Sequence, residues 1–266
     1  KLDTIKSSEF FSKGFMDTIE ATAQYFATSA GSVLDILVPE YILKNVGKLK
    51  KPKKDEKAPV KVSHEKYVIQ GDDEERYSTW KSLIRQEFAK KKSLYFLFPT
   101  IEEATYAFSI LEKGIEGYAF TLHGALPPKK IVETWNEIVK EKHPVVVIAT
   151  GGFLSLPRND IETLIVERES SRFYKILRRP YLDVRQVAEI FAEKNCMRLF
   201  FADNFLRLET LYRHDEGELV EASPFKFRSL STAKDTLIDM REIKNQNRVS
   251  FKILSPCGVS RPVSPK

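Results

Sequence analysis

The chain has 266 residues with a net charge of +6, and its 42% hydrophobic and 30% charged residues are typical of a globular protein with a core of its own. No apolar stretch approaches the ~18 residues that cross a membrane, and the first residues, KLDTIKSSEFFSKG, lack the apolar centre of a signal peptide. Two cysteines, Cys196 and Cys257, supply neither a disulfide framework nor a zinc-ligand pattern, so we predict a reduced, cytoplasmic protein with no membrane contact and no metal.

The first predicted elements are two helices within residues 8–43. Apolar residues from Phe10 to Phe26 recur mostly at three- and four-residue steps, which places them on one face of a helix. The sequence SAGS at 29–32 ends this helix, and Pro39 divides or kinks the shorter apolar segment that follows. A piece of this size cannot form a core alone. We therefore predict that residues 1–43 are a small helical appendage that docks onto something larger.

The net charge has its source in residues 44–61, KNVGKLKKPKKDEKAPVK. This segment contains eight lysines and two acidic residues, which leaves 35 basic and 35 acidic residues in the rest of the chain. Two prolines, a glycine and few large apolar residues predict a flexible linker. It is either a solvated hinge or a mobile basic arm that neutralises nucleic-acid phosphates. In the second case the DNA-binding residues include Lys44, Lys48, Lys50, Lys51, Lys53, Lys54 and Lys57.

From residue 62 to residue 245 the chain alternates between apolar, β-rich runs and helical stretches. The predicted strands are 67–70, 94–98, 118–122, 145–149, 163–167, 198–202 and 236–240. The predicted helices are 79–91, 101–113, 128–141, 184–195 and 204–214. Runs that are apolar on successive residues indicate strands buried on both faces. We therefore predict an α/β domain with a doubly wound, mostly parallel sheet, followed by a tail or severed connection at 246–266.

Several blocks of this domain resemble one family in order and spacing. They are the sequence HGAL at 123–126 with Trp135 after it, VVVIATGGFLSLPRNDIETLIVERESSRFYK, RRPYLDVRQVAEIF, LFFADNFLRLETLYRHDEGEL and TLIDMRE. Upstream, YFATSAGSVLDILVPEYIL is similar to the end of an amino-terminal DNA-binding region. Together the blocks resemble primosomal protein N′, the PriA family of replication-restart DNA helicases. The resemblance implies that 62–245 is the first RecA-like lobe of a superfamily 2 helicase, with a P-loop NTPase fold.

Within this resemblance, GDDEERYST at 71–79 stands where the family has its phosphate loop, G-V-T-G-S-G-K-T. Only Gly71 and a hydroxyl at Ser78 persist, and Tyr77 replaces the lysine. Four successive carboxylates would face the triphosphate, at a cost of about 3 kcal/mol for each like-charge contact at an effective dielectric near 20. The family uses ATP, Mg²⁺ and structural zinc, but this degenerate Walker A sequence predicts no cofactor for this chain.

The other ATP motifs are altered as well. The family's D-E-E-H reads Glu167-Arg168-Glu169-Ser170, and Arg168 cannot accept a proton in place of the glutamate. The S-A-T-P block reads DNFL at 203–206, and the arginine of the G-T-R segment is Gly151. The resemblance therefore implies that the chain keeps the helicase scaffold without catalytic residues.

A basic and aromatic cluster follows the fifth predicted strand. It contains Arg178, Arg179 and Arg185 with Tyr174 and Tyr181, in a neighbourhood that lies close to DNA in the family. Guanidinium groups and aromatic rings together suit a single strand, although Arg178 and Arg179 could also be a solvated turn.

Three functions are compatible with the sequence. The first, our main hypothesis, is a PriA-like primosomal protein that binds branched or single-stranded DNA, and possible replication-restart partners, without hydrolysing ATP. The second is a fragment of an active ATP-dependent 3′–5′ DNA helicase subunit whose second lobe and zinc module lie on a longer chain. The third is a structural module that binds proteins only.

Overall fold

A computed structural model describes residues 10–50, 64–225, 252–254 and 260–262 of the chain. The chain divides into two units, residues 1–227 and 228–266, and each is described by itself. In the second unit, β8 (Lys252–Leu254) and β9 (Ser260–Pro262) form an antiparallel pair. The strand predicted at 236–240 lies outside the described residues.

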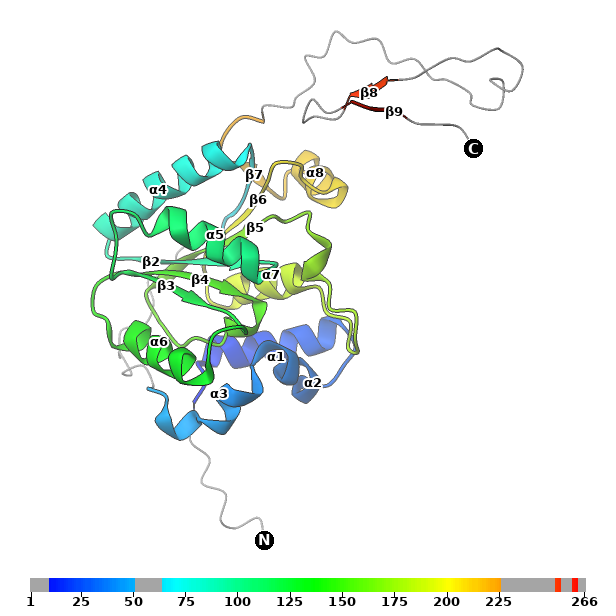
Figure 1. The fold of residues 1–266 in the computed structure, drawn as a ribbon. Helices are drawn as coiled ribbons and strands as arrows, with labels where there is room; N and C mark the ends of the chain where they lie inside the picture. Colours follow the sequence, from blue (N-terminus) through cyan, green and yellow to red (C-terminus); the bar gives the residue numbers. More distant parts are fainter. Residues whose placement is uncertain (1–9, 51–63, 226–251, 255–259, 263–266) are drawn as a thin grey trace. The chain divides into compact units, whose positions relative to one another are not determined.

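The first unit is built on a seven-stranded sheet in which every pair of neighbouring strands is parallel. Its strands are β1 (Lys66–Gln70), β2 (Ser93–Phe98), β3 (Ala119–Leu122), β4 (Val146–Thr150), β5 (Ile161–Glu167), β6 (Arg198–Asp203) and β7 (Val220–Glu221). The order across the sheet is β3-β4-β2-β5-β6-β1-β7 (Figure 1). The predicted α/β class with a parallel sheet is confirmed. Strand β7 was not predicted, because two residues are too few to show an alternation of apolar and polar side chains.

Helices connect most of these strands. The helices are α1 (Lys13–Tyr25), α2 (Ala30–Leu37), α3 (Glu40–Lys44), α4 (Asp73–Ala89), α5 (Ile101–Leu111), α6 (Pro128–Lys140), α7 (Val184–Lys194) and α8 (Leu208–Asp215). Three 3-10 turns are η1 (Val46–Lys48), η2 (Gly151–Phe153) and η3 (Arg172–Tyr174). Two predicted starts were wrong: α4 begins earlier than residue 79, and α8 begins later than residue 204.

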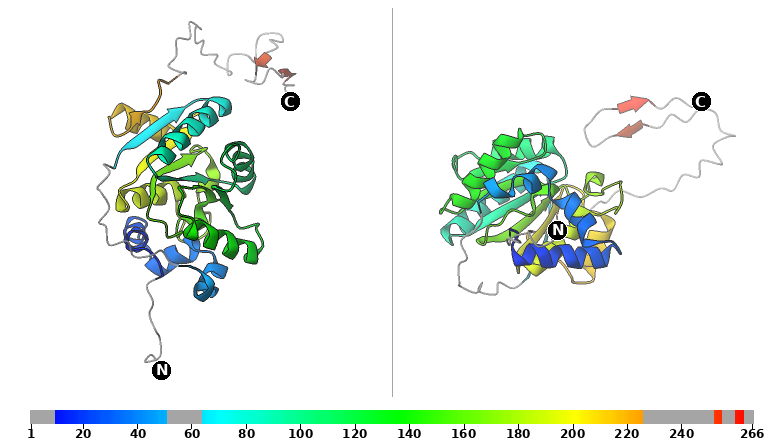
Figure 2. Two further views of the ribbon diagram at one scale, coloured as in Figure 1. Left: turned by 90° about the vertical axis from the view of Figure 1, so that its left-hand side faces the viewer. Right: turned by 90° about the horizontal axis from the view of Figure 1, so that it is seen from below.

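The sheet is covered on both faces, as Figures 1 and 2 show. On β2, Leu94, Phe96 and Phe98 face a core shared with α4 and α5, whereas Tyr95 and Leu97 face a core shared with α1, α6 and α7. All five side chains are at most 2% exposed. This alternation explains the continuous apolar runs in the sequence, because every residue of such a strand is covered by helices on one side or the other.

The amino-terminal helices belong to the larger of these two cores. The Phe15 ring of α1 lies 6.4 Å from the Phe191 ring of α7, and the Phe10 ring lies 6.3 Å from the Trp135 ring of α6. Pro39 separates α2 from α3, as its position in the apolar segment suggested. The predicted appendage therefore shares its apolar face with the sheet domain.

The structure differs from the predicted linker in its first seven residues. Lys44 ends α3, residues 46–48 form η1, and the Leu49 side chain is buried. The Asn136 side chain on α6 accepts from the Lys50 amide at 2.7 Å and donates to the Lys48 carbonyl at 3.1 Å. Buried Leu49 and these two hydrogen bonds hold residues 44–50 against the domain. Residues 51–61 lie outside the described residues.

Candidate nucleotide and nucleic-acid sites

The acidic turn after β1 starts a helix. The Asp72 carboxylate accepts from the Glu75 amide at 3.0 Å and so caps α4, while Asp73, Glu74 and Glu75 occupy the first helical turn. Carboxylates are favoured in these positions because they satisfy free amide groups and interact with the positive end of the helix dipole. The four consecutive acids therefore stabilise the start of α4, and an incoming phosphate would have to displace or face them.

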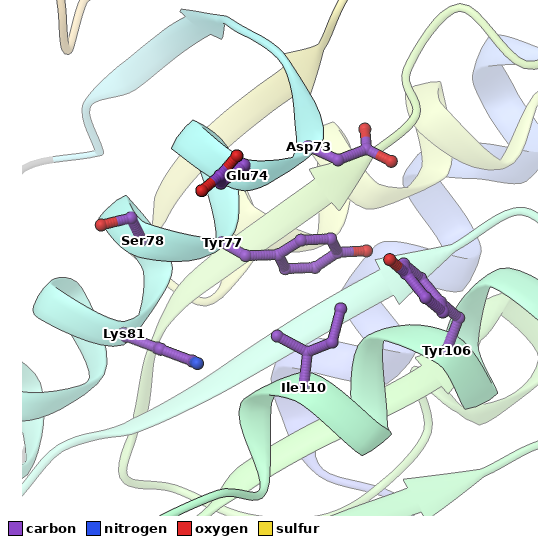
Figure 3. Close-up of a pocket in the computed structure, with 7 residues that line it drawn as sticks. All are labelled: Asp73, Glu74, Tyr77, Ser78, Lys81, Tyr106 and Ile110. Carbon is purple, nitrogen blue, oxygen red and sulfur yellow. The ribbon is translucent and has the colours of Figure 1, made fainter.

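Tyr77 and Ser78, which replace the phosphate-binding lysine and threonine in the resemblance, lie on the next turn of α4. Both line a pocket of about 500 Å³ that is bounded by α4 and α5 (Figure 3). The Tyr77 side chain is only 6% exposed, and its ring meets the Tyr106 ring of α5 edge to face, with centroids 6.1 Å apart. Neither residue forms a phosphate cradle.

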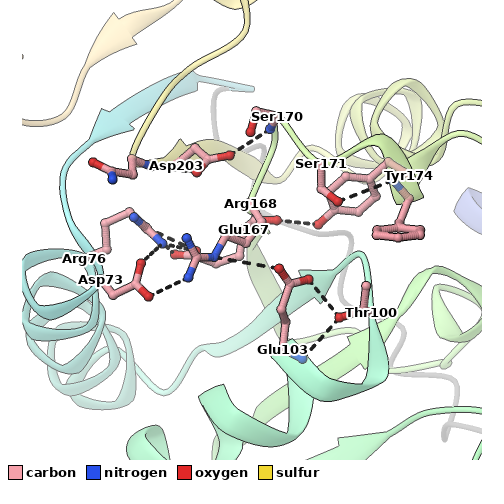
Figure 4. A network of polar contacts seen from close by, with 12 residues as sticks. Asp73, Arg76, Thr100, Glu103, Glu167, Arg168, Ser170, Ser171, Tyr174 and Asp203 are labelled. Atoms are coloured by element: carbon pink, nitrogen blue, oxygen red, sulfur yellow. Dashed lines mark hydrogen bonds and ion pairs between the residues drawn. The ribbon is translucent and has the colours of Figure 1, made fainter. Parts of the chain in front are cut away.

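The centre of the site is a buried ion pair between Arg76 and Glu167 (Figure 4). Both Nε and Nη2 of Arg76 lie 3.2 Å from Oε2 of Glu167, which ends β5. The Arg76 guanidinium also donates to the Gly71 carbonyl at 2.6 Å and to the Asp73 carboxylate at 3.0 Å. The Trp80 indole donates to the other Glu167 oxygen. A cation of the protein therefore fills the space between the turn after β1 and the end of β5.

The charges of this pair depend on each other. Burial opposes the charge of Arg76, but Glu167 and Asp73 together hold the Arg76 pKa above its ordinary value. Burial raises the pKa of Glu167, and the Arg76 and Trp80 hydrogen bonds lower it in part. Arg76 thus stays protonated although its side chain is fully buried. A buried charge of this kind is stable only while a carboxylate lies beside it.

Arg168 lies on the outer side of this pair, in the position where the resemblance places a catalytic base. It pairs with the Asp73 carboxylate, and its Nε lies 3.9 Å from the Glu103 carboxylate. Glu103 in turn contacts Thr100, the N-cap residue of α5: the Thr100 hydroxyl donates to the Glu103 carboxylate at 2.9 Å and accepts from the Glu103 amide at 3.2 Å. The arginines thus link the ends of β1, β2 and β5. The carboxylates of Glu167 and Asp73 are already paired with the Arg76 and Arg168 guanidinium groups, so this site does not fit Mg²⁺ or a nucleotide.

Glu169 and Asp203 hold the loops beyond β5 and β6. The buried Glu169 carboxylate accepts from the Arg207 amide at 2.6 Å, from the Arg207 guanidinium at 2.8 Å and from the Thr210 hydroxyl at 3.0 Å. Asp203 accepts from the Ser170 amide at 2.9 Å. In the described residues, no group of three or more His, Cys, Asp or Glu side chains could hold a metal ion. Glu169 is a structural anchor for α8, because Arg207 and Thr210 lie at the start of that helix.

Arg185 differs from its predicted role. Its side chain is 3% exposed, pairs with the Asp183 carboxylate at 2.7 Å and donates to the Glu169 carbonyl at 2.5 Å. The guanidinium lies 5.6 Å from the centre of the buried Tyr174 ring. These contacts use its donors inside the domain, so Arg185 and Tyr174 are not available to a DNA strand. The sequence could not distinguish them from their exposed neighbours because all lie within one basic and aromatic run.

The neighbouring segment 172–181 does reach the surface. Its exposed side chains are Arg172, Phe173, Lys175, Leu177, Arg178, Arg179 and Tyr181. A backbone bridge between Lys175 and Asp183 and a 2.8 Å bond from the Ile176 amide to the Leu182 carbonyl fix its base. Within the described part of the chain, neither Arg178 nor Arg179 forms an ion pair. The segment presents four cations and two aromatic rings to solvent.

Only three of the seven lysines that were predicted to bind DNA lie in the described residues. Lys44, Lys48 and Lys50 are exposed, and Lys44 pairs with Glu40 at 2.6 Å. The other four lysines, at 51, 53, 54 and 57, lie outside the described residues. In the ranges that the structure covers, no helix is long and apolar enough to cross a membrane.

Sequence reasoning missed Arg76, Asp73 and Trp80 as one cluster with Glu167. The one signal available was their spacing, because residues 73, 76, 77 and 80 lie on one face of a helix. This spacing is informative only if the helix begins at residue 73, whereas the predicted helix began at residue 79.

The sequence matches no protein-family model and no curated protein. Among solved structures, the chain is similar to the C-terminal domain of S. cerevisiae Dbp5 bound to Gle1 and IP6, with 10% identity over 60% of this chain and 89% of that one and a TM-score of 0.44. It is also similar to Mss116p bound to ssRNA and AMP-PNP, with 14% identity, 83% and 44% coverage and a TM-score of 0.42. A third similarity is to S. tokodaii Xpd4, with 12% identity, 62% and 40% coverage and a TM-score of 0.31. Similarity this distant does not extend to function.

Proposed function

We propose that this chain is a PriA-like primosomal protein, a helicase-type lobe that binds DNA and takes part in replication restart without hydrolysing ATP. The observation that carries the proposal is the buried pair of Arg76 and Glu167, with Nη2 and Oε2 3.2 Å apart and neither side chain exposed. A nucleotide at the end of β1 would have to displace Arg76 from three acceptors and leave Glu167 without its counter-ion. Removal of one partner of such a pair costs about 3–5 kcal/mol.

The DNA-binding part of the proposal is supported by segment 172–181. Arg178 and Arg179 are exposed without a carboxylate partner among the described residues, and Tyr181 is exposed beside them. Cations that follow a phosphate backbone and rings that stack on bases are the two requirements of single-strand binding. The lysines of residues 44–61 would add further sequence-independent contacts to phosphates.

Two measurements test the proposal. Calorimetric titration of the full chain with Mg-ATP is expected to give no binding heat, and a fluorescence-anisotropy series on forked and single-stranded DNA is expected to show affinity that falls steeply between about 50 and 200 mM salt. ATP binding at micromolar concentration contradicts the closed nucleotide site. Absence of DNA binding at about 50 mM salt contradicts the nucleic-acid role. The two parts therefore fail separately.

A further inference from the structure

The pocket between α4 and α5 has properties that the nucleotide and DNA sites do not use. Its volume of about 500 Å³ lies within the ordinary range of small-molecule sites, about 300–1,000 Å³. Its walls come from two helices on one face of the sheet, so their positions are fixed by the packed core. Figure 3 shows the Tyr77 and Tyr106 side chains from the two helices pointing toward one another across it.

One polar group in the pocket is open to a ligand. The Tyr77 side chain is 6% exposed, and its hydroxyl is not one of the fully buried polar atoms that lack a hydrogen-bond partner among the described residues, so it stays accessible from the pocket. Burial, with Glu167 and Asp73 nearby, raises the Tyr77 pKa well above its ordinary value, so this hydroxyl is neutral at physiological pH. Because the Tyr77 hydroxyl is open to the pocket, a ligand there can form a hydrogen bond with it. The hydroxyl can donate or accept in such a contact.

The charges around the pocket decide which ligand suits it. Asp73 is neutralised by Arg76 and Arg168, whereas Glu74 is exposed and forms no ion pair in the described ranges. Lys81 lies at the other end of the pocket (Figure 3). The end with Glu74 and the two tyrosines therefore repels phosphates and attracts a cation. Tyrosine faces attract ammonium groups as well, through the negative charge of the ring face.

We infer that this pocket binds a protonated alkylamine, with its ammonium group between Glu74 and the tyrosine rings. The chemistry is that of a lysine side chain presented by a partner protein or of a free polyamine. The Tyr77 hydroxyl accepts a hydrogen bond from the ammonium group, Tyr106 covers it, and Glu74 supplies the counter-charge. This site does not depend on the proposed DNA-binding function, because none of its residues lies in segment 172–181.

The test is calorimetric titration of the full chain with three probes at low salt. Spermidine and N-acetyl-lysine methylamide carry the ammonium group, and the same lysine derivative acetylated on its side chain does not. We expect the charged probes to bind and the neutral probe not to bind. Binding of spermidine alone identifies a free polyamine as the ligand, whereas binding of the lysine derivative alone identifies a protein side chain.

Variants locate the binding in the pocket. Tyr106→Ala is expected to weaken it by about two- to fivefold, the range for an exposed aromatic contact with a cation, and Glu74→Gln and Tyr77→Phe by about twofold. Tyr25→Ala and Glu133→Gln, at exposed positions on α1 and α6, are matched controls that should bind normally. Failure of both charged probes to bind overturns the inference, and so does binding that all three pocket variants leave unchanged.

Discussion

Arg76 on α4 and Glu167 at the end of β5 form an ion pair in which neither side chain is exposed to solvent. The two residues are 91 positions apart in the sequence. Their contact joins the first helix after β1 to the centre of the sheet. The domain therefore relies on an internal salt bridge at the place where its proposed relatives would hold a nucleotide.

Substitution of one partner should destabilise the domain strongly. Arg76→Met leaves Glu167 buried without its counter-ion, and we expect a loss of about 3–5 kcal/mol in the free energy of unfolding. The double variant Arg76→Met/Glu167→Leu removes both charges, so it should lose much less than Arg76→Met alone. Urea denaturation measures both. Arg85→Ala, an exposed position on the same helix, should change stability by less than about 0.5 kcal/mol. A double variant as unstable as the single one contradicts this account.

Acid should destabilise the domain through Glu189. Burial alone would raise the Glu189 pKa, but hydrogen bonds from Arg213 and Lys66 hold it below its ordinary value of 4.5. The folded state therefore binds the proton more weakly than the unfolded state, so the stabilisation is fully present above about pH 4.5 and is lost as the pH falls through the folded pKa.

The Glu189→Gln variant checks this linkage. It should be less stable than the original protein at pH 7 by about 1.5–3 kcal/mol, the range for hydrogen bonds to a charged group, and the difference should shrink at low pH. Melting temperatures between pH 7 and pH 3 give the comparison. Glu193→Gln, which changes an exposed glutamate of the same helix, is the control. Parallel curves for the original protein and Glu189→Gln would falsify this linkage.

Introduction at position 151 of the arginine that the PriA-like resemblance places there should fail for steric reasons. A Cβ atom on Gly151 would lie 2.7 Å from Cγ1 of Val184, closer than packed carbon atoms can approach. We expect Gly151→Ala to cost about 1–3 kcal/mol through overpacking, and Gly151→Arg at least as much. Thermal unfolding measures the loss.

The neighbouring glycine gives the matched comparison. A Cβ atom on Gly152 would lie 3.5 Å from Pro39, an ordinary contact, so Gly152→Ala should be tolerated better. Addition of Val184→Ala to Gly151→Ala should recover part of the loss. If the two alanine variants are equally stable, the close contact at Gly151 does not limit the position.

Segment 172–181 should control nucleic-acid affinity and its salt dependence. Loss of one phosphate contact in Arg178→Ala or Arg179→Ala should reduce the slope of log K against log salt by about 0.7 on single-stranded DNA. Tyr181→Ala should weaken binding by about 1–3 kcal/mol if a base stacks on the ring. Lys113→Ala, an exposed lysine after α5, is the control for a general change of charge. Equal affinities for all four variants and the original protein would remove this segment from the proposed site.

The sheet could be predicted from the sequence because buried parallel strands are apolar on successive residues. β2 and β4 show this most clearly, with every side chain of β2 buried. The same local signal could not place Arg76, since its partner Glu167 is distant in sequence and becomes a neighbour only when β1 and β5 lie in one sheet. Nor could it separate buried Arg185 from exposed Arg178 and Arg179. Exposure depends on the path of the loop, which local composition does not determine.

The acidic turn has a related lesson. Four carboxylates after a strand predict, on the charge argument alone, that a phosphate is repelled, and this stays a prediction. They also form the start of α4, with Asp72 as its cap, and this structural role was not predicted. The cap is recognisable only when the helix is extended back to residue 73.

The packing of α1 against α7 has a consequence for the cooperativity of unfolding. Because Phe15, Phe191 and the strands of the sheet contribute to one apolar cluster, the amino-terminal helices and the sheet lack a boundary at which one could melt while the other remains intact. Deletion of the first 50 residues would remove one side of that cluster. The apolar surface that this exposes on the sheet domain would promote aggregation.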